Sequence, residues 1–302
     1  MYDIIVIGAG PAGLTAALYA CRASKRVLVL EKGAFGGQIT FSPRVENIPG
    51  FSSVTGNEFA DKLVEQVLMQ GADIEPCEVL SVRDEGKVKV VVTDSGEYEG
   101  KAVIIAVGAK HRLPGLEGEE KYIGEGISFC AVCDGAFYAD KTVCVLGGGN
   151  SALQEAILLS DIARQVYVVQ NLETLTGEQK LRDVLYSKEN VSVMLDSVIV
   201  ELHGEGELSA VTVENNTTKE KQKLDIDGLF VAIGLIPQNE PFAEHIELNS
   251  WGYACSDETC TTKTSGIFVA GDCRQKRIRQ VATAAADGAV AALRACDYVD
   301  EL

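Results

Sequence analysis

The sequence carries little positive charge for its length. Its 302 residues include 27 lysines and arginines against 44 aspartates and glutamates, which gives a net charge of −17. Because binding to nucleic-acid phosphates requires a basic surface, this balance excludes nucleic acid as the main partner. Long apolar runs are lacking as well. The longest apolar stretch, residues 281–296, is too short to span a bilayer and contains Asp287 and Arg294. The sequence therefore predicts a protein with no membrane-spanning segment.

Signals for export are also lacking. The first residues lead directly into a strand-like run, with no basic segment and no cleavage site, so we expect no signal peptide. Nine cysteines form an odd and widely spaced set, unlike the dense framework of a small secreted domain. We therefore expect a soluble, cytoplasmic protein in which most cysteines are reduced and buried. Histidine is scarce, and the three present offer no ligands at a spacing that suggests zinc, so no metal site is predicted.

The N-terminal segment has the pattern of a dinucleotide-binding unit. Strand, glycine loop, helix, strand and acid follow one another at residues 3–7, 8–13, 14–22, 27–30 and 31. Gly8 permits the tight turn, Gly10 lets the backbone approach a pyrophosphate, and Gly13 lets the helix pack closely on the strand. Glu31 is placed to accept a hydrogen bond from a ribose hydroxyl. All these parts occur in the expected order, which makes the motif specific.

A second unit of the same design begins about 140 residues later. It comprises a strand at 142–146, a glycine loop at 147–152, a helix through Leu159 and a strand at 166–169. Two dinucleotide-binding units in one chain suggest an enzyme that moves electrons between two cofactors. The glycines of the second loop also have a purely structural interpretation, because a strand–helix turn can retain them for packing alone.

The remaining pattern predicts an α/β fold with two Rossmann-like dinucleotide-binding domains, the second inserted into the first. A strand at 266–270, a Gly-Asp pair and a helix from Val281 close the first domain, which comprises residues 1–113 and 247–302. The inserted domain comprises residues 114–246, with linkers near 112–116 and 245–249. Further elements are expected as a helix at 56–70, hairpins at 79–92 and 198–213, and strands at 102–107 and 228–233.

Two cysteines stand at a spacing that suggests redox chemistry. Cys130 and Cys133 form a C-x-x-C pair, in which one thiol often has a lowered pKa and is therefore reactive. The adjacent Asp134 is a carboxylate that can move the proton which thiol–disulfide exchange requires. A zinc half-site or a merely buried pair is the alternative. Cys255 and Cys260 could form a second pair, but their spacing in a polar loop makes this unremarkable.

These motifs together resemble the low-molecular-weight, bacterial-type flavin thioredoxin reductases over essentially the whole chain. The segments that carry the resemblance are 8–13 with Glu31, 36–38, 45–50, 106–109, 130–135, 147–152, 231–234, 271–272 and 279–280. The resemblance implies an FAD-dependent homodimer that reduces thioredoxin or a thioredoxin-like protein. It implies that FAD is held by Gly8, Gly10, Pro11, Ala12, Gly13, Glu31, Gly37, Gln38, Asn47, Ala106, Gly108, Asp272, Arg279, Gln280 and Val281.

The resemblance also implies roles for the C-x-x-C segment. Cys130 and Cys133 would form the redox-active disulfide. Cys133 would lie against the isoalloxazine and form the charge-transfer pair, and Cys130 would attack the disulfide of the substrate. Asp134 would be the acid/base.

The chain departs from this family where the 2′-phosphate of NADPH would bind. NADPH-linked members carry a His-Arg-Arg run after the second strand of the second unit and a further Arg four residues beyond it. The aligned residues here are Gln170, Asn171, Leu172 and Thr176, with Glu173 among them. A phosphate dianion needs charge-assisted donors, so binding of a pyridine nucleotide is doubtful.

Three electron donors follow from this departure. Ferredoxin is favoured, as in a subgroup of the family that lacks the arginine motif, and the second unit would then be a scaffold. NADH would favour an acid at the end of the strand, where this chain has Gln170. NADPH held by other residues is the third. Four cations, at positions 274, 276, 277 and 279, either steer an acidic ferredoxin or serve the flavin and a solvated loop, and we favour the second interpretation.

Overall fold

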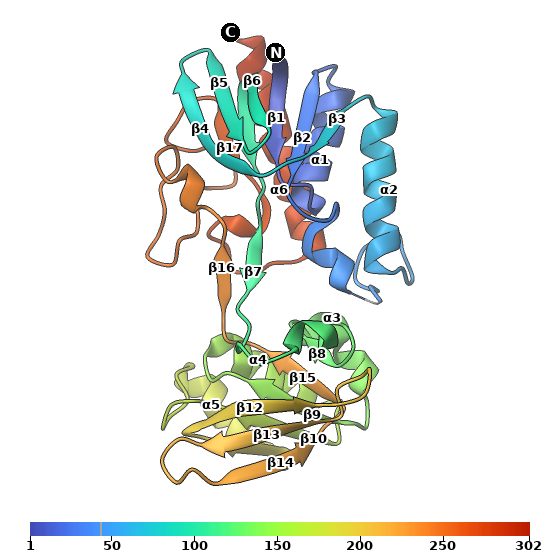
Figure 1. The fold of residues 1–302 in the computed structure, drawn as a ribbon, viewed down its shortest axis with the longest axis vertical. Coiled ribbons are helices and arrows are strands. Elements are labelled where there is room, and N and C mark those ends of the chain that lie inside the picture. The colour runs from blue at the N-terminus through green and yellow to red at the C-terminus, as the bar shows by residue number, and fades with distance from the viewer. Residues whose placement is uncertain (43) are drawn as a thin grey trace. The chain divides into compact units, whose positions relative to one another are not determined.

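The computed structural model describes residues 1–42 and 44–302. It divides into two compact units, one formed by Met1–Lys110 and Ile236–Leu302 and the other by His111–Leu235 (Figure 1). We call them unit 1 and unit 2. The second boundary lies after Leu235, and not after residue 246 as the sequence suggested. The reason is that residues 236–246 pack in unit 1, where Phe242 and Ile246 join an apolar core and His245 Nε2 lies 2.6 Å from the carbonyl oxygen of Val82.

Unit 1 is built on a seven-stranded sheet of order β3-β2-β1-β6-β5-β4, with β17 also paired to β6. The strands are β1 (Tyr2–Ile7), β2 (Val27–Glu31), β3 (Asp73–Pro76), β4 (Val79–Glu85), β5 (Val88–Thr93), β6 (Gly96–Ile105) and β17 (Ile267–Val269). Strands β3, β2, β1, β6 and β17 pair in parallel, whereas β4, β5 and β6 are antiparallel. The apolar parallel strands are almost fully buried, as expected for strands covered on both faces.

Helices cover the parallel part of this sheet. They are α1 (Pro11–Arg22), α2 (Gly56–Met69) and α6 (Val281–Asp300), with short 3₁₀ helices η1 (Gly37–Phe41), η4 (Glu240–Phe242) and η5 (Gly271–Cys273). Helices α1 and α6 pack closely because Gly288 lies where any Cβ would be 2.1 Å from the carbonyl oxygen of Ala12. Helix α2 starts with a capping box between Thr55 and Glu58, which satisfies backbone donors at its first turn.

Unit 2 contains a five-stranded parallel sheet and a three-stranded antiparallel sheet. The first has the order β11-β10-β9-β15-β8 and the second β12-β13-β14. The strands are β8 (Ile127–Ser128), β9 (Thr142–Leu146), β10 (Gln165–Val169), β11 (Val191–Met194), β12 (Ser197–His203), β13 (Ala210–Asn215), β14 (Lys221–Asp225) and β15 (Gly228–Val231). The helices are η2 (Glu119–Tyr122), α3 (Ala131–Asp134), η3 (Gly135–Tyr138), α4 (Asn150–Ser160) and α5 (Gln179–Tyr186).

The two chain segments that connect the units pair with each other. They are β7 (Ala109–His111) and β16 (Leu235–Pro237), which form a two-stranded sheet (Figure 1). The α/β fold with two Rossmann-like units therefore agrees with the sequence-based prediction. Within the part of the chain that the structure describes, no helix combines the length and apolar character needed to cross a membrane.

Candidate functional site

The first glycine loop has a geometry that only glycine permits at two positions. Gly8 follows β1 with φ of +105°, and a Cβ there would lie 2.4 Å from the carbonyl oxygen of Ala106. A Cβ on Gly13 would lie 1.8 Å from the carbonyl oxygen of Gly8. Both separations are shorter than van der Waals contact, so these glycines let α1 lie directly against the β1 turn.

The N-terminus of α1 faces an open space. Gly10 is the N-cap residue and no side chain caps the helix, while Pro11 occupies its first turn. The first-turn N–H groups of a helix have no acceptors within the helix and attract anions. A Cβ on Gly10 would meet no atom closer than 3.9 Å, whereas one on Gly37 would approach the Cα of Gly10 to 3.2 Å. The loop therefore offers backbone donors and room for an anionic group.

Glu31 is held at the end of β2 beside this loop. Its Oε2 accepts a hydrogen bond of 2.7 Å from the N–H of Ala9, and its Oε1 accepts one of 2.7 Å from the N–H of Gly33. The N–H of Gly36 in turn donates to the carbonyl oxygen of Ala9 at 2.7 Å. The carboxylate is thus fixed in one orientation, and each oxygen retains a lone pair for a further donor such as a ribose hydroxyl.

Residues far along the chain join the same loop in unit 1. A Cβ on Gly271 would lie 2.7 Å from the Cβ of Ala12, which places η5 against the start of α1. Asp272 follows, and burial is the main cause that raises the pKa of its carboxyl, while the Lys276 charge lowers it. Its Oδ1 is buried without a hydrogen bond to any described residue, and Lys276 Nζ lies 3.7 Å away. A buried acceptor of this kind is expected to face a ligand donor.

The remaining predicted flavin contacts are linked to these elements. Asn47 Nδ2 donates to Gln280 Oε1 at 3.2 Å, and Arg279 Nε donates to the carbonyl oxygen of Asp272 at 3.3 Å. The Gln38 amide donates to the carbonyl oxygen of Ala109. Val281 begins α6, and Ala106 and Gly108 follow β6. All fifteen residues predicted to hold FAD therefore lie in unit 1.

The four cations at 274–279 do not form a free positive patch. Arg274 is buried and pairs with Asp287 at 2.8 Å, and Lys276 pairs with the same carboxylate at 3.0 Å. The guanidinium of Arg279 stacks over the ring of Tyr253 at 4.2 Å. Arg277 is exposed. The arrangement therefore favours a structural role for three of these four residues.

The disulfide lies in unit 2, at the start of α3. Cys130 and Cys133 are bonded, with a Cα–Cα distance of 5.2 Å. The N–H of Cys133 lies 3.1 Å from both the Sγ and the carbonyl oxygen of Cys130, so the short helix closes around the bond. The other seven cysteines are free, and five of them are buried. Cys255 and Cys260 are among the free ones, so they form no second pair.

Asp134 lies beside the disulfide and is connected to it through Ser128. The Ser128 hydroxyl donates to Asp134 Oδ2 at 2.6 Å and accepts from the N–H of Cys130 at 3.2 Å. Burial raises the pKa of Asp134, and the Ser128 hydrogen bond partly opposes this. Asp134 Oδ1 is buried with no hydrogen-bond partner among the described residues. A carboxyl with a raised pKa next to a disulfide is suited to proton transfer.

The second glycine loop keeps the backbone conformation of a nucleotide loop, but a later segment of unit 2 packs against it. Gly147 has φ of +134°, and the carbonyl oxygen of Gly148 accepts from the N–H groups of Thr176 and Gly177 at 2.8 and 2.9 Å. Gln170 is buried, and a Cβ on Gly148 would lie 2.5 Å from its amide carbon. The segment after β10 therefore packs directly on the loop.

A carboxylate lies near the start of α4. Asn150 Nδ2 donates to Glu178 Oε1 at 3.0 Å, and the N–H of Glu178 donates to Asn150 Oδ1 at 2.7 Å. Glu178 therefore brings negative charge close to the helix N-terminus, where the phosphates of a dinucleotide would bind.

Sequence reasoning missed two polar residues near the disulfide. Ser128 stands two residues before Cys130, and only the folded turn shows that it connects Asp134 to the backbone. Glu155 is half-buried on α4, on the same face as Ala152 and Leu159, and its Oε2 is buried. A lone carboxyl on an apolar helix face was the signal available for it. Among residues 1–42 and 44–302, no group of three or more potential ligands is arranged to hold a metal ion.

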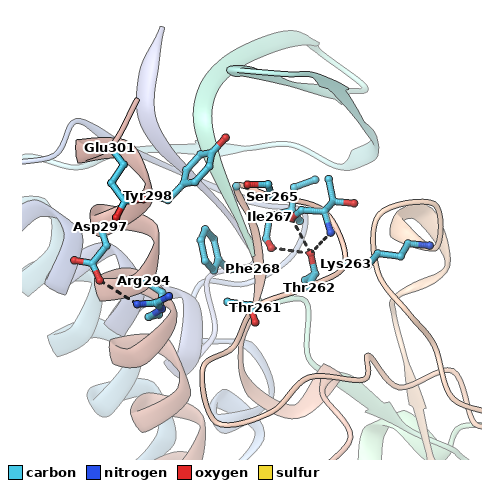
Figure 2. Close-up of a pocket in the computed structure, with 12 residues that line it drawn as sticks. Thr261, Thr262, Lys263, Ser265, Ile267, Phe268, Arg294, Asp297, Tyr298 and Glu301 are labelled. Carbon is cyan, nitrogen blue, oxygen red and sulfur yellow. Dashed lines mark hydrogen bonds and ion pairs between the residues drawn. The ribbon is translucent and has the colours of Figure 1, made fainter.

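A separate hollow in unit 1 contains none of the predicted site residues. It has a volume of about 400 Å³ and lies between residues 261–268 and the end of α6 (Figure 2). Arg294 in its wall pairs with Asp297 at 3.3 Å, and the Thr262 hydroxyl bonds the carbonyl oxygen of Ile267 at 2.8 Å. Its polar groups thus bond one another and leave no buried group that points to a ligand.

Comparison with known proteins identifies the class that this fold and site define. The family model described as pyridine nucleotide-disulphide oxidoreductase matches residues 2–288. The chain therefore belongs to the pyridine nucleotide-disulphide oxidoreductase family and is a flavin disulfide oxidoreductase.

Its relatives include bacterial thioredoxin reductases. A protein of Clostridium pasteurianum described as the 34.2 kDa protein in rubredoxin operon is 43% identical over 98% of this chain and 97% of its own length. The thioredoxin reductase of Bacillus subtilis is 40% identical over 100% of this chain and 96% of its own length. Among solved structures, the crystal structure of the thioredoxin reductase of Streptococcus pyogenes is similar to this one with a TM-score of 0.95. The two sequences are 39% identical, and the match covers 100% of this chain and 99% of that chain.

Proposed function

We propose that this protein is an FAD-dependent thioredoxin-disulfide reductase. Electrons pass from a donor through FAD to the Cys130–Cys133 pair and then to thioredoxin or a thioredoxin-like protein. The observation that carries the proposal is the disulfide with Asp134 beside it, in a chain whose unit 1 also has a complete nucleotide loop. The names of the relatives agree with this substrate.

The residues of unit 1 fit the chemical groups of FAD. The open N-terminus of α1 with Gly10, Pro11 and Ala12 suits the pyrophosphate, and the fixed carboxylate of Glu31 suits ribose hydroxyls. The buried Oδ1 of Asp272 has no hydrogen-bond partner among the described residues and suits a further hydroxyl donor. When bound, FAD supplies the electron pair that reduces the disulfide.

The chain's own residues carry out the thiol chemistry. After reduction, the Cys130 thiolate attacks the disulfide of the partner and forms a mixed disulfide, and the first partner sulfur leaves as a thiolate. Cys133 then gives its proton to Asp134 and attacks Cys130 Sγ, which re-forms the internal disulfide and releases the second partner sulfur. The two electrons of the dithiol end on the partner.

We propose ferredoxin as the electron donor, because the second nucleotide loop is poorly suited to NADPH. No cation occupies position 170, 171, 172 or 176, and Glu178 lies against Asn150 at the start of α4. A 2′-phosphate dianion would meet the Glu178 carboxylate there, and none of these four positions would supply a countercharge. Gln170 is buried against Gly148, where an acid would be expected for NADH. A dependence on NADH or NADPH is the alternative, supported by the intact glycine loop.

Anaerobic mixing with single donors tests this assignment. The purified flavoprotein is mixed separately with reduced ferredoxin, NADPH and NADH, and the flavin absorbance is followed. Rapid bleaching with ferredoxin, together with bleaching at least about 100-fold slower with either nucleotide, is expected. Rapid bleaching by NADPH would refute the ferredoxin assignment while leaving the disulfide reductase intact. The matched sample is the Cys133→Ser protein, which should still bleach but should not reduce thioredoxin.

A homodimer and a cytoplasmic location complete the proposal. The homodimer follows from the family resemblance and is tested by light scattering on the purified flavoprotein. The seven free cysteines are consistent with a reducing compartment.

A further inference from the structure

A second carboxyl stands on α4, the helix of unit 2 against which α3 packs. Glu155 projects from α4, and α3, which ends at Asp134, packs against that helix. The contact is close, because a Cβ on Gly135 would lie 3.4 Å from the Leu159 side chain, one turn after Glu155 on the same face. The Asp134 charge is the second cause, after burial, that raises the pKa of Glu155.

Neither carboxyl is neutralised by a cation. Glu155 Oε2 and Asp134 Oδ1 are both buried with no hydrogen-bond partner among the described residues. The polar contact of Asp134 is the uncharged Ser128 hydroxyl. Double ionisation is unfavourable for two carboxyls that each have a buried oxygen without a countercharge, so we expect the pair to retain one proton at neutral pH.

The surroundings of the pair contain few other titratable groups. Tyr138 from η3 and Cys144 from β9 have pKa values raised by burial to about 12 and therefore stay protonated. Lys141 lies over the Tyr138 ring at 5.4 Å. The β10 side chains that pack with α4 are Val166 and Val168, which do not titrate, and α5, which also contacts α4, carries Lys180, Arg182 and Asp183. Only the Asp134 charge bears on Glu155, besides burial itself.

We propose that Glu155 is a positioning residue that stores the proton used by Asp134. This proposal rests on the proposed function. In disulfide reduction, two electrons break the Cys130–Cys133 bond and one proton converts one of the two sulfurs to a thiol. The proton passes from Glu155 to Asp134 and from Asp134 to the sulfur, and solvent then re-protonates Glu155. No further oxidant or reductant is involved.

The pair therefore sets the pH range of the reduction. Burial, and then the Asp134 charge, raise the pKa of Glu155 to about 8, so the stored proton is present up to that pH. Without Glu155 the only carboxyl proton is that of Asp134. The Ser128 hydrogen bond opposes the burial that raises the pKa of Asp134, so we expect the rate then to decline at lower pH.

The test compares the flavoprotein with Glu155→Gln between pH 5.5 and 9.5. Reduced methyl viologen is the electron donor, thioredoxin the acceptor, and viologen absorbance the readout. We expect the wild-type rate to fall with a midpoint near pH 8 and the variant midpoint to lie at least one pH unit lower. The variant should be within about twofold of wild type at pH 5.5 and about tenfold slower at pH 8, since one pH unit corresponds to a factor of ten.

Two further variants make the outcome decisive. Glu155→Asp retains a carboxyl, so its midpoint should lie between those of wild type and Glu155→Gln. Gln154→Glu adds an exposed carboxyl on the preceding residue and should leave the pH profile unchanged. Equal midpoints for wild type and Glu155→Gln, with normal flavin content and melting temperature, would overturn the proposal. A wild-type protein that viologen bleaches but that reduces no thioredoxin at any pH would instead refute the proposed function.

Discussion

The protonation of Glu155 can be tested through stability, without turnover. Burial, and then the Asp134 charge, raise the pKa of the Glu155 carboxyl from its ordinary value of 4.5 to about 8. Because the folded pKa is the higher one, the folded state binds more protons than the unfolded chain between these limits. The stabilisation from the bound proton is complete below pH 4.5 and is lost as the pH rises to 8.

The size of the effect follows from the two pKa values. They differ by about 3.5, and each pKa unit corresponds to about 1.4 kcal/mol, so the free energy of unfolding should fall by on the order of 5 kcal/mol across this range. Glu155→Gln keeps the shape of the protonated side chain but has no such proton. The difference in unfolding free energy between wild type and the variant should therefore shrink or reverse steadily from pH 5 to pH 8.

Urea unfolding at half-unit pH steps measures this difference. Far-ultraviolet circular dichroism is the appropriate probe, because the single tryptophan, Trp251, lies in unit 1 and Glu155 lies in unit 2. Gln154→Glu is the matched control, since its carboxyl is exposed and should contribute no slope. A difference between wild type and Glu155→Gln that stays constant within about 1 kcal/mol from pH 5 to pH 8 would show that Glu155 is ionised in the folded protein.

Three further predictions concern the two nucleotide loops and the disulfide. Cys133→Ser should abolish thioredoxin reduction and retain bound flavin, and loss of the flavin would contradict the roles given to the pair. Gly13→Ala should lose flavin and at least about 3 kcal/mol of stability, since the added Cβ would lie 1.8 Å from the carbonyl oxygen of Gly8. The control is Gly33→Ala, whose Cβ would lie 3.4 Å from Glu31 Oε1, and this variant should retain both flavin and stability. NADPH should bleach the flavin at least about tenfold faster in a variant that combines Gln170→His, Asn171→Arg, Leu172→Arg and Thr176→Arg. An unchanged rate would show that the missing cations do not limit NADPH use.

Local patterns were sufficient to predict most of the fold. The apolar runs that form β1, β2 and β9, with the glycine or acid that ends each, are signals within a few residues of one another. The structure has these strands within one residue of prediction. Strand β6 begins at Gly96, earlier than the predicted 102, because its first half pairs with β5 in a hairpin. The polar Glu97 and Glu99 hid that half from a search for buried runs.

Features that depend on packing between distant segments could not be predicted. The boundary after Leu235 reflects the insertion of Phe242 and Ile246 into the core of unit 1, which no local composition reveals. The cations at 274–279 read as a cluster in sequence, yet Asp287 on α6 engages two of them. The pairing of Glu155 with Asp134 likewise depends on how α3 packs on α4.

The paired segments β7 and β16 make unit 2 a removable module. The chain enters it through Ala109–His111 and leaves it through Leu235–Pro237, and these two segments are hydrogen-bonded neighbours. A domain whose two ends lie side by side can be excised or exchanged with little cost in loop closure, because the host chain needs only a short bridge. Because unit 2 carries the Cys130–Cys133 disulfide, exchange of this one continuous segment would replace the redox pair while the discontinuous chain of unit 1 stays as it is.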